Sequence, residues 1–245
     1  MKKTFAAFLA MVMLLVCGMA AFAETAVMTH EEYVAAELDT PVVVETYVQA
    51  KQGWWNDQIT VYCQSEDGAY FVYNMACTQE DAEKLVPGTK IRVTGFKGEW
   101  SGEVEIMDGT FEIIEGAEPF IAEAFDVTAL LGTEELIAHQ NEFVSFKGMT
   151  VEPSTIKDVE GEFAFLYNWD GSGAEGTDSD LYFNVSVNGQ TYNFVIEYYL
   201  CGADSDAYKA VQNLKIGDVV DLEGFLYWYN GVQAHITSVV PAAAE

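Results

Sequence analysis

Short runs of alternating apolar and polar residues recur along most of this chain, and they are separated by turns that contain glycine. Such alternation predicts half-buried β-strands. In the first half, the predicted strands are 41–51, 59–65, 70–75, 90–99 and 103–115. In the second half, they are 142–151, 181–187, 190–200, 219–227 and 232–239, while 163–169 could also belong to one of the first two strands there. The chain is therefore predicted to be mainly β.

Each half also predicts one helix between its third and fourth strands. In the first half, Thr78 followed by Asp81 forms a capping box for a helix that ends near Leu85, before a Pro-Gly pair. In the second half, residues 204–214 place Ala207, Ala210, Val211 and Leu214 on one helical face. A short acidic helix is predicted ahead of each first strand, at 29–33 and at 133–136.

The two halves share a sequence motif. The segment 88–96, GTKIRVTGF, is followed by Trp-Ser-Gly at 100–102, and the segment 217–225, GDVVDLEGF, is followed by Tyr-Asn-Gly at 229–231. The motif occupies the same place in both predicted units, at the fourth strand and the turn after it. This repetition indicates that one all-β unit was duplicated.

Five strands with a helix between the third and the fourth resemble the oligonucleotide/oligosaccharide-binding (OB) fold. The resemblance covers 40–116 and 142–240. It implies two partly open five-stranded barrels, each of which would hold extended ligands on strands 2 and 3 and on the 1–2 and 4–5 loops. The expected division is a leader at 1–23, a first domain with its N-terminal helix at 24–116, a helical linker at 117–141, a second domain at 142–241, and a frayed tail at 242–245.

The leader has the features of a secretory signal peptide. Two lysines follow Met1, an apolar run spans 5–22, and Ala-Phe-Ala at 21–23 provides a cleavage site. Cleavage after Ala23 predicts an exported protein, located outside the cell or in the cell envelope, without stable membrane insertion. Three cysteines remain after cleavage: Cys63, Cys77 and Cys201. A hairpin turn at Asp67-Gly68 would hold Cys63 and Cys77 too far apart for a bridge, so buried thiols are expected.

The net charge of the chain disfavours some classes of binding partner. The chain carries 39 acidic residues against 11 Lys and Arg, a formal net charge of −28. Affinity for nucleic acid comes largely from cations that neutralise phosphates. We therefore expect nucleic acid, and likewise anionic membranes, to be unlikely partners. The sequence leaves the oligomeric state open.

Aromatic residues gather where the OB resemblance places the ligand-binding loops. The predicted ligand-binding residues are Trp54, Trp55, Asn56, Trp100, Trp169, Tyr227, Trp228, Tyr229 and Asn230. The aromatic rings among these residues could stack on a ligand. In the alternative interpretation, the same rings pack on each other and close the barrel mouth.

No catalytic motif accompanies these aromatics. The sequence has no G-x-S-x-G, P-loop or G-x-G-x-x-G, and its three histidines lack metal-ligand spacing. The acidic segment 170–180 departs from EF-hand spacing, which favours a solvated loop over a calcium site. The sequence predicts an exported, non-catalytic binding module without a cofactor or metal, with a glycan or peptide as ligand. The alternatives are a nucleic-acid-binding OB protein, which the charge disfavours, and an envelope protein that docks another protein and has structural tryptophans.

Overall fold

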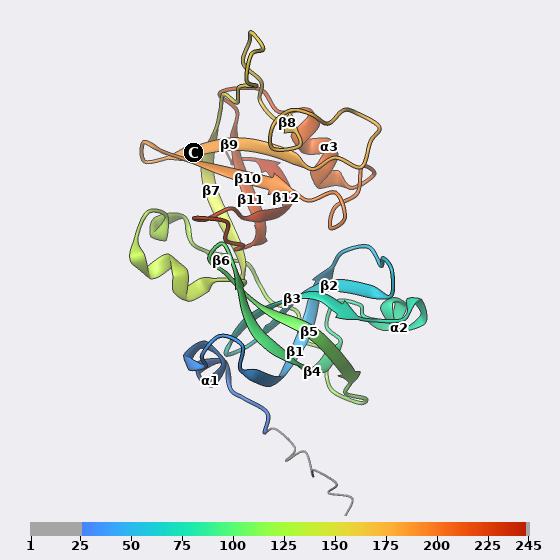
Figure 1. The fold of residues 1–245 in the computed structure, drawn as a ribbon. Helices are drawn as coiled ribbons and strands as arrows, with labels where there is room; N and C mark the ends of the chain where they lie inside the picture. The colour runs from blue at the N-terminus through green and yellow to red at the C-terminus, as the bar shows by residue number, and fades with distance from the viewer. Residues whose placement is uncertain (1–25, 244–245) are drawn as a thin grey trace, which may run out of the picture.

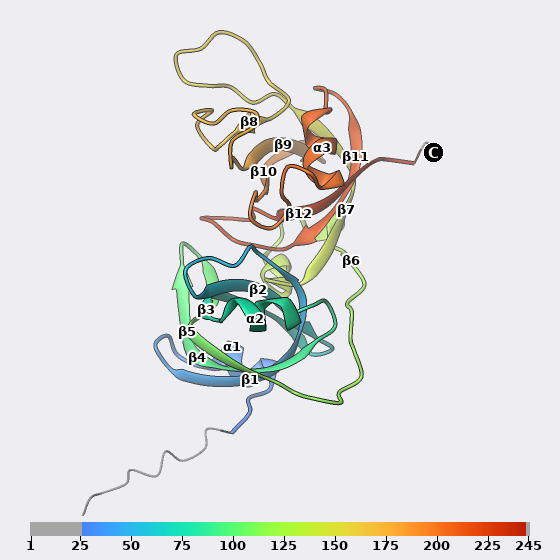
Figure 2. The ribbon, with the colours of Figure 1, turned by 90° about the vertical axis from the view of Figure 1, so that its right-hand side faces the viewer.

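A computed structural model describes residues 26–243, which form two β-barrels joined by a connecting segment (Figure 1). The predicted signal peptide and the last two residues of the predicted tail lie outside the described residues. In two perpendicular views, the second barrel sits on the first with the helices at the periphery (Figure 2). None of the helices within residues 26–243 has the length and apolar character needed to span a bilayer.

The first barrel is closed by five strands in the order β1-β2-β3-β5-β4. Its strands are β1 (Pro41–Lys51), β2 (Gln58–Ser65), β3 (Gly68–Ala76), β4 (Lys90–Trp100) and β5 (Glu103–Ile113). Neighbouring strands are antiparallel except β3 and β5, which are parallel. Helix α1 (His30–Ala35) precedes the barrel, and α2 (Gln79–Lys84) lies between β3 and β4. Both begin as the sequence predicts, because the Thr29 and Thr78 side chains accept hydrogen bonds from backbone N–H groups of the first turn.

The second barrel repeats this topology. Its strands are β7 (Phe143–Glu152), β9 (Leu181–Val187), β10 (Gln190–Ile196), β11 (Val219–Phe225) and β12 (His235–Pro241), with α3 (Asp206–Gln212) between β10 and β11. The order β7-β11-β12-β10-β9 is closed by pairing between β7 and β9, and β10 runs parallel to β12. Two short strands, β6 (Phe125–Asp126) and β8 (Leu166–Tyr167), add to its margins. The prediction of two OB-like barrels is confirmed.

The connecting segment differs from the predicted helical linker. No regular structure spans 114–124, and the rest holds β6 and two 3₁₀ helices, η1 (Thr128–Leu130) and η2 (Glu134–His139). Gly116 and Gly132 adopt positive φ angles of 74° and 80°, and Pro119 lies between them in sequence. These residues interrupt α-helical propagation, so the apolar residues pack from short turns.

The β2–β3 hairpin turns one residue earlier than predicted. Ser65 pairs with Gly68, which leaves Glu66 and Asp67 as the turn. Gly68 is needed for space, since a Cβ there would lie 2.2 Å from the His30 ring. The register places Cys63 opposite Tyr70. All three cysteines in the described part of the chain are free and buried, as predicted.

Candidate ligand-binding site

The outer face of β2 and β3 in the first barrel is covered by the second barrel. Tyr62 and Phe71 are only 1% and 3% exposed. The Tyr62 ring stacks on Phe225 with centroids 4.5 Å apart, and the Phe71 ring meets Tyr227 edge-on at 5.2 Å. These rings form a separate apolar cluster at the junction of the barrels. The face that OB folds use for ligands is therefore an internal surface in the first barrel.

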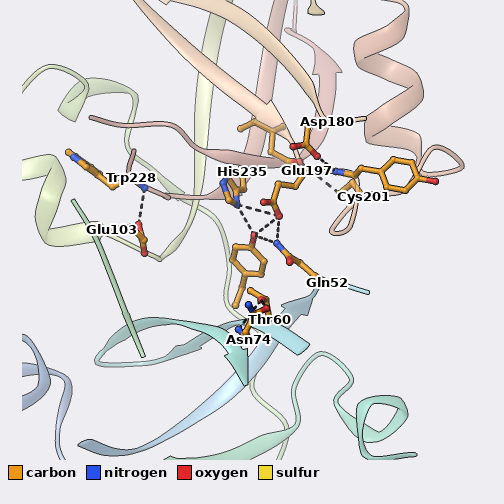
Figure 3. Close-up of polar contacts among 12 residues, drawn as sticks. Gln52, Thr60, Asn74, Glu103, Asp180, Glu197, Cys201, Trp228 and His235 are labelled. Atoms are coloured by element: carbon orange, nitrogen blue, oxygen red, sulfur yellow. Dashed lines mark hydrogen bonds and ion pairs between the residues drawn. The ribbon is translucent and has the colours of Figure 1, made fainter. Parts of the chain in front are cut away.

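A polar network continues this junction (Figure 3). The Tyr62 hydroxyl lies 2.7 Å from Nδ1 of His235 and 3.3 Å from Oε2 of Glu197, and the Gln52 side chain donates to the same Glu197 oxygen. Burial lowers the pKa of His235 to about 3, so its imidazole is neutral at pH 7. The 4.0 Å approach of His235 to Glu197 is consequently not an ion pair, although the distance would admit one.

Burial also acts on the carboxyl group of this network. It raises the pKa of Glu197 to about 7, and the nearby charge of Asp180 adds to the effect. The hydrogen bonds from Tyr62 and Gln52 act in the opposite direction. Glu197 can therefore donate or accept a proton near neutral pH from a position at the junction of the barrels.

The second contact between the barrels joins their two 4–5 turns. The backbone N–H of Trp228 donates to Oε2 of Glu103 at 2.8 Å, and that of Asn230 donates to the Ser101 carbonyl at 2.7 Å. A Cβ at Gly102 would lie 2.9 Å from the Trp228 ring, so a glycine allows this approach. Trp228 and Asn230, both predicted as ligand-binding residues, thus lie where the turns meet.

The corresponding face of the second barrel is open. Strands β9 and β10, together with the loops before β9 and after β11, enclose a cavity of about 650 Å³. The residues that line it are Trp169, Tyr182, Asn184, Asn193, Glu197, Tyr227, Tyr229, Gln233 and His235. Trp169 is 74% exposed and Tyr229 47%, so both rings are accessible at its edge. The cavity brings together three of the predicted residues: Trp169, Tyr227 and Tyr229.

Three amide side chains form a hydrogen-bonded row in this cavity. Gln233 donates to Asn193 at 3.3 Å, Asn193 donates to Asn184 at 2.9 Å, and Asn184 donates to the Pro153 carbonyl at 2.9 Å. A primary amide has two N–H donors, so each side chain can donate a second hydrogen bond to a ligand. These amides were not among the ligand-binding residues predicted from the sequence. The alternation in 181–187 and 190–200 could have found them, since Asn184 and Asn193 lie on the polar side of their strands.

The other predicted residues lie outside this cavity. Trp54 donates its indole N–H to the Cys77 carbonyl at 2.8 Å, while Trp55 and Trp100 are 78% and 61% exposed. Asn56 adopts a positive φ of 49° in the turn before β2. The first 1–2 loop also touches the second barrel, because the Gly53 N–H donates to the Tyr199 carbonyl at 2.9 Å. Of the five tryptophans, Trp169 alone lines this cavity.

The cavity wall has no permanently charged cationic side chain. Among its lining residues there is no Lys or Arg, and no cluster of three or more potential metal ligands occurs within residues 26–243. Burial raises the pKa of Tyr182 to about 12, so this hydroxyl is protonated at pH 7. The wall therefore offers aromatic faces, amide groups and the single carboxyl group of Glu197.

No protein-family model matches the sequence, and no curated protein matches it either. Among solved structures, the chain is similar to the HINa domain of Ifi202 in complex with 20-bp dsDNA, at 13% identity and a TM-score of 0.35, covering 81% of this chain and 92% of that one. A murine DNA-binding protein bound with dsDNA gives 12% identity, a TM-score of 0.36, and coverage of 84% and 97%. A replication protein A heterotrimer bound to ssDNA gives 9% identity and a TM-score of 0.28, and the match covers 83% of this chain and 49% of that one.

The fold defines the chain as a tandem OB-fold protein. The neighbours are described as DNA complexes, which stands against the expected glycan or peptide ligand and against the expectation that nucleic acid is an unlikely partner. Net charge describes the whole surface, whereas the cavity wall has aromatic and amide groups that need no cation to contact a base, so the charge alone does not exclude nucleic acid. At these TM-scores, no residue role is taken from the neighbours.

Proposed function

We propose that this chain is an exported bacterial, non-catalytic protein that binds an unpaired nucleobase in the cavity on β9 and β10. The base would come from single-stranded nucleic acid or from a free nucleoside. One observation carries the proposal: accessible aromatic rings and a row of amides line the same open cavity. Export is inferred from the basic, apolar and small-residue parts of the leader.

The aromatic rings would supply most of the affinity. Every nucleobase has a π-face, and stacking on an aromatic side chain is worth about 1–3 kcal/mol per base. Trp169 and Tyr229 are accessible enough to stack on a ligand, whereas Tyr227 is already stacked on His235 with centroids 4.0 Å apart. We assign the stacking role to Trp169 and Tyr229 and a supporting role to Tyr227.

The amide row would read the edge of the base. Asn and Gln offer a donor and an acceptor side by side, which matches the paired donor and acceptor of an adenine edge. Asn193 lies at the centre of the row, between Gln233 and Asn184, so a base that stacks in the cavity would meet it edge-on. A preference for adenine over uracil and thymine is the expected result.

Electrostatics give the proposal a distinctive signature. With a net charge of −28 and no Lys or Arg lining the cavity, the protein repels the phosphates that follow a bound base. Ordinary nucleic-acid binding weakens steeply with salt because counterions are released. Here salt screens a repulsion, so affinity for a short oligonucleotide should hold or rise as salt increases.

Titration calorimetry with adenosine, cytidine, uridine and guanosine, and then with single-stranded hexanucleotides between about 50 and 200 mM salt, tests the proposal. Trp169→Ala should weaken adenosine binding roughly tenfold or more through lost stacking. Trp55→Ala is the matched control, since Trp55 is similarly exposed and lies outside the cavity. The proposal fails if no nucleoside or hexanucleotide binds at millimolar concentration, or if both variants have the same effect.

A further inference from the structure

A second cavity lies on the first barrel, away from the β9–β10 face. It has a volume of about 570 Å³ and is enclosed by α1, by β3, β4 and β5, and by η2 of the connecting segment. Most of its wall is apolar, formed by Val34, Ala35, Ala69, Val104, Ile137 and Ala138. The volume is in the range of small-molecule sites, which are mostly apolar with a few polar groups.

Lys97, on β4, is an unusual polar group in this wall. It is 6% exposed, and its ammonium donates to the carbonyls of Val34 and Ala36 at 2.7 and 2.8 Å. No carboxylate lies within ion-pair distance of Lys97 in the described part of the chain, although the protein has 39 acidic residues. An ammonium has three N–H donors. One donor therefore remains for a ligand, next to a buried positive charge.

Tyr33, on α1, supplies a second unsatisfied group. Its side chain is 2% exposed, and its hydroxyl has no hydrogen-bond partner among the described residues. The Lys97 ammonium lies 5.4 Å from the centroid of the Tyr33 ring. Burial raises the pKa of Tyr33, so the hydroxyl keeps its proton and can donate it to an acceptor. A buried polar group without a partner destabilises the folded state, and a hydrogen-bond acceptor on a ligand would offset that cost.

We propose that this cavity binds a small organic carboxylate with an apolar body. One carboxylate oxygen would accept from the remaining Lys97 N–H and the other from the Tyr33 hydroxyl. The body would lie against Val34, Val104 and Ile137. This site is independent of the nucleobase cavity, because it shares no lining residue with it.

The remaining ionisable groups of the wall favour a singly charged ligand. Burial lowers the pKa of His30, so it adds no positive charge at pH 7, and Glu31 is an exposed carboxylate at the cavity. Glu103 and Glu105 also act on the Tyr33 hydroxyl, and burial raises the pKa of both carboxyl groups. Lys97 is the one buried cation that lines this cavity, within a strongly acidic protein. A monoanion pairs with it at one point, whereas a multiply charged ligand such as a phosphate ester would meet more repulsion.

The test compares three probes that share one body: hydrocinnamate, hydrocinnamyl alcohol and phenylpropylamine. Calorimetry on the full chain at pH 7 should show hydrocinnamate binding at least tenfold more tightly than the alcohol, and no binding of the amine. Tyr33→Phe removes a hydroxyl without a partner and should keep the fold while weakening hydrocinnamate roughly tenfold. Lys97→Met should abolish binding, whereas Lys215→Met and Tyr199→Phe, at exposed residues outside the cavity, should not.

Three results would overturn the proposal: equal affinity for the three probes, no binding of hydrocinnamate, or unchanged affinity in Tyr33→Phe. Lys97 also holds the end of α1, so its variant could detach that helix. Tyr33→Phe and the choice of probe head group keep the proposal testable in that case. Nucleoside binding to the same samples distinguishes failure here from failure of the proposed function.

Discussion

Replacing Glu103 with Gln should stabilise the protein at neutral and alkaline pH. Glu103 is fully buried where the two 4–5 turns meet, and its Oε2 accepts from the Trp228 N–H at 2.8 Å and from Gln140 at 3.2 Å. Its Oε1 has no partner among the described residues. A glutamine keeps the acceptor that both donors need and removes the charge.

The magnitude follows from proton linkage. Burial raises the pKa of Glu103 from its ordinary 4.5 to about 8. The folded state holds the Glu103 proton more tightly than the unfolded chain does. The contribution of this proton to stability is therefore complete below about pH 4.5 and is lost as the pH rises to about 8. The loss between about pH 5 and pH 7.5 amounts to roughly 3 kcal/mol. Glu105, on the same strand, has a pKa raised to about 7 by burial and adds a loss of the same sign.

Urea unfolding between about pH 5 and pH 8 measures this effect. The wild-type unfolding free energy should fall across the range, and Glu103→Gln should flatten the fall and be more stable than wild type at the upper end. Glu123→Gln is the matched control, since Glu123 is exposed on the connecting segment. Parallel pH profiles for wild type and Glu103→Gln would contradict this expectation, because they would mean that Glu103 titrates in the folded state as it does in the unfolded chain.

Three further results are expected. Tyr62→Phe removes the hydroxyl that bonds His235 and contacts Glu197, and should lower the unfolding free energy by roughly 1–3 kcal/mol in urea titration; an unchanged value would mean that water replaces the hydroxyl. Phe225→Ala empties the aromatic cluster between the barrels and should cost about 3–5 kcal/mol, with a small loss pointing to a solvated junction. Burial raises the pKa of the Cys63 thiol, so iodoacetamide should label it only after unfolding, and rapid labelling of the native protein would contradict its burial.

Strand order could be predicted from the sequence because it depends on local patterns. The alternation of apolar and polar residues located the ten barrel strands. The repeated glycine-containing motif aligned the fourth strand of one half with the fourth strand of the other. The connecting segment could not be predicted in the same way. Its apolar residues fit helical spacing, yet Gly116 and Pro119 made short turns the better solution, and packing against the barrels stabilises those turns.

The sequence singled out part of the cavity wall for a similar reason. Trp169, Tyr227 and Tyr229, which line the cavity, were noticed because aromatic residues in loops stand out in a sequence. The contact between Trp228 and Glu103, and the burial of Tyr62 under Phe225, depend on how two distant barrels dock. No local pattern encodes such docking. The amide row lies on strands, where single polar residues look like ordinary solvent-facing positions.

Duplication of a binding fold would ordinarily double the number of sites, but the docking of these barrels makes the two copies unequal. The β2–β3 face of the first copy holds the second copy, so a chain with two OB units offers one open face of this kind. The expected stoichiometry for a base-sized ligand on that face is one per chain. Substitutions at Tyr62 or Phe71 should then change stability, whereas substitutions at the equivalent strands of the second copy, such as Asn184 or Asn193, should change recognition. Under the proposed function, the same strand positions would stabilise the docked barrels in one copy and determine ligand selectivity in the other.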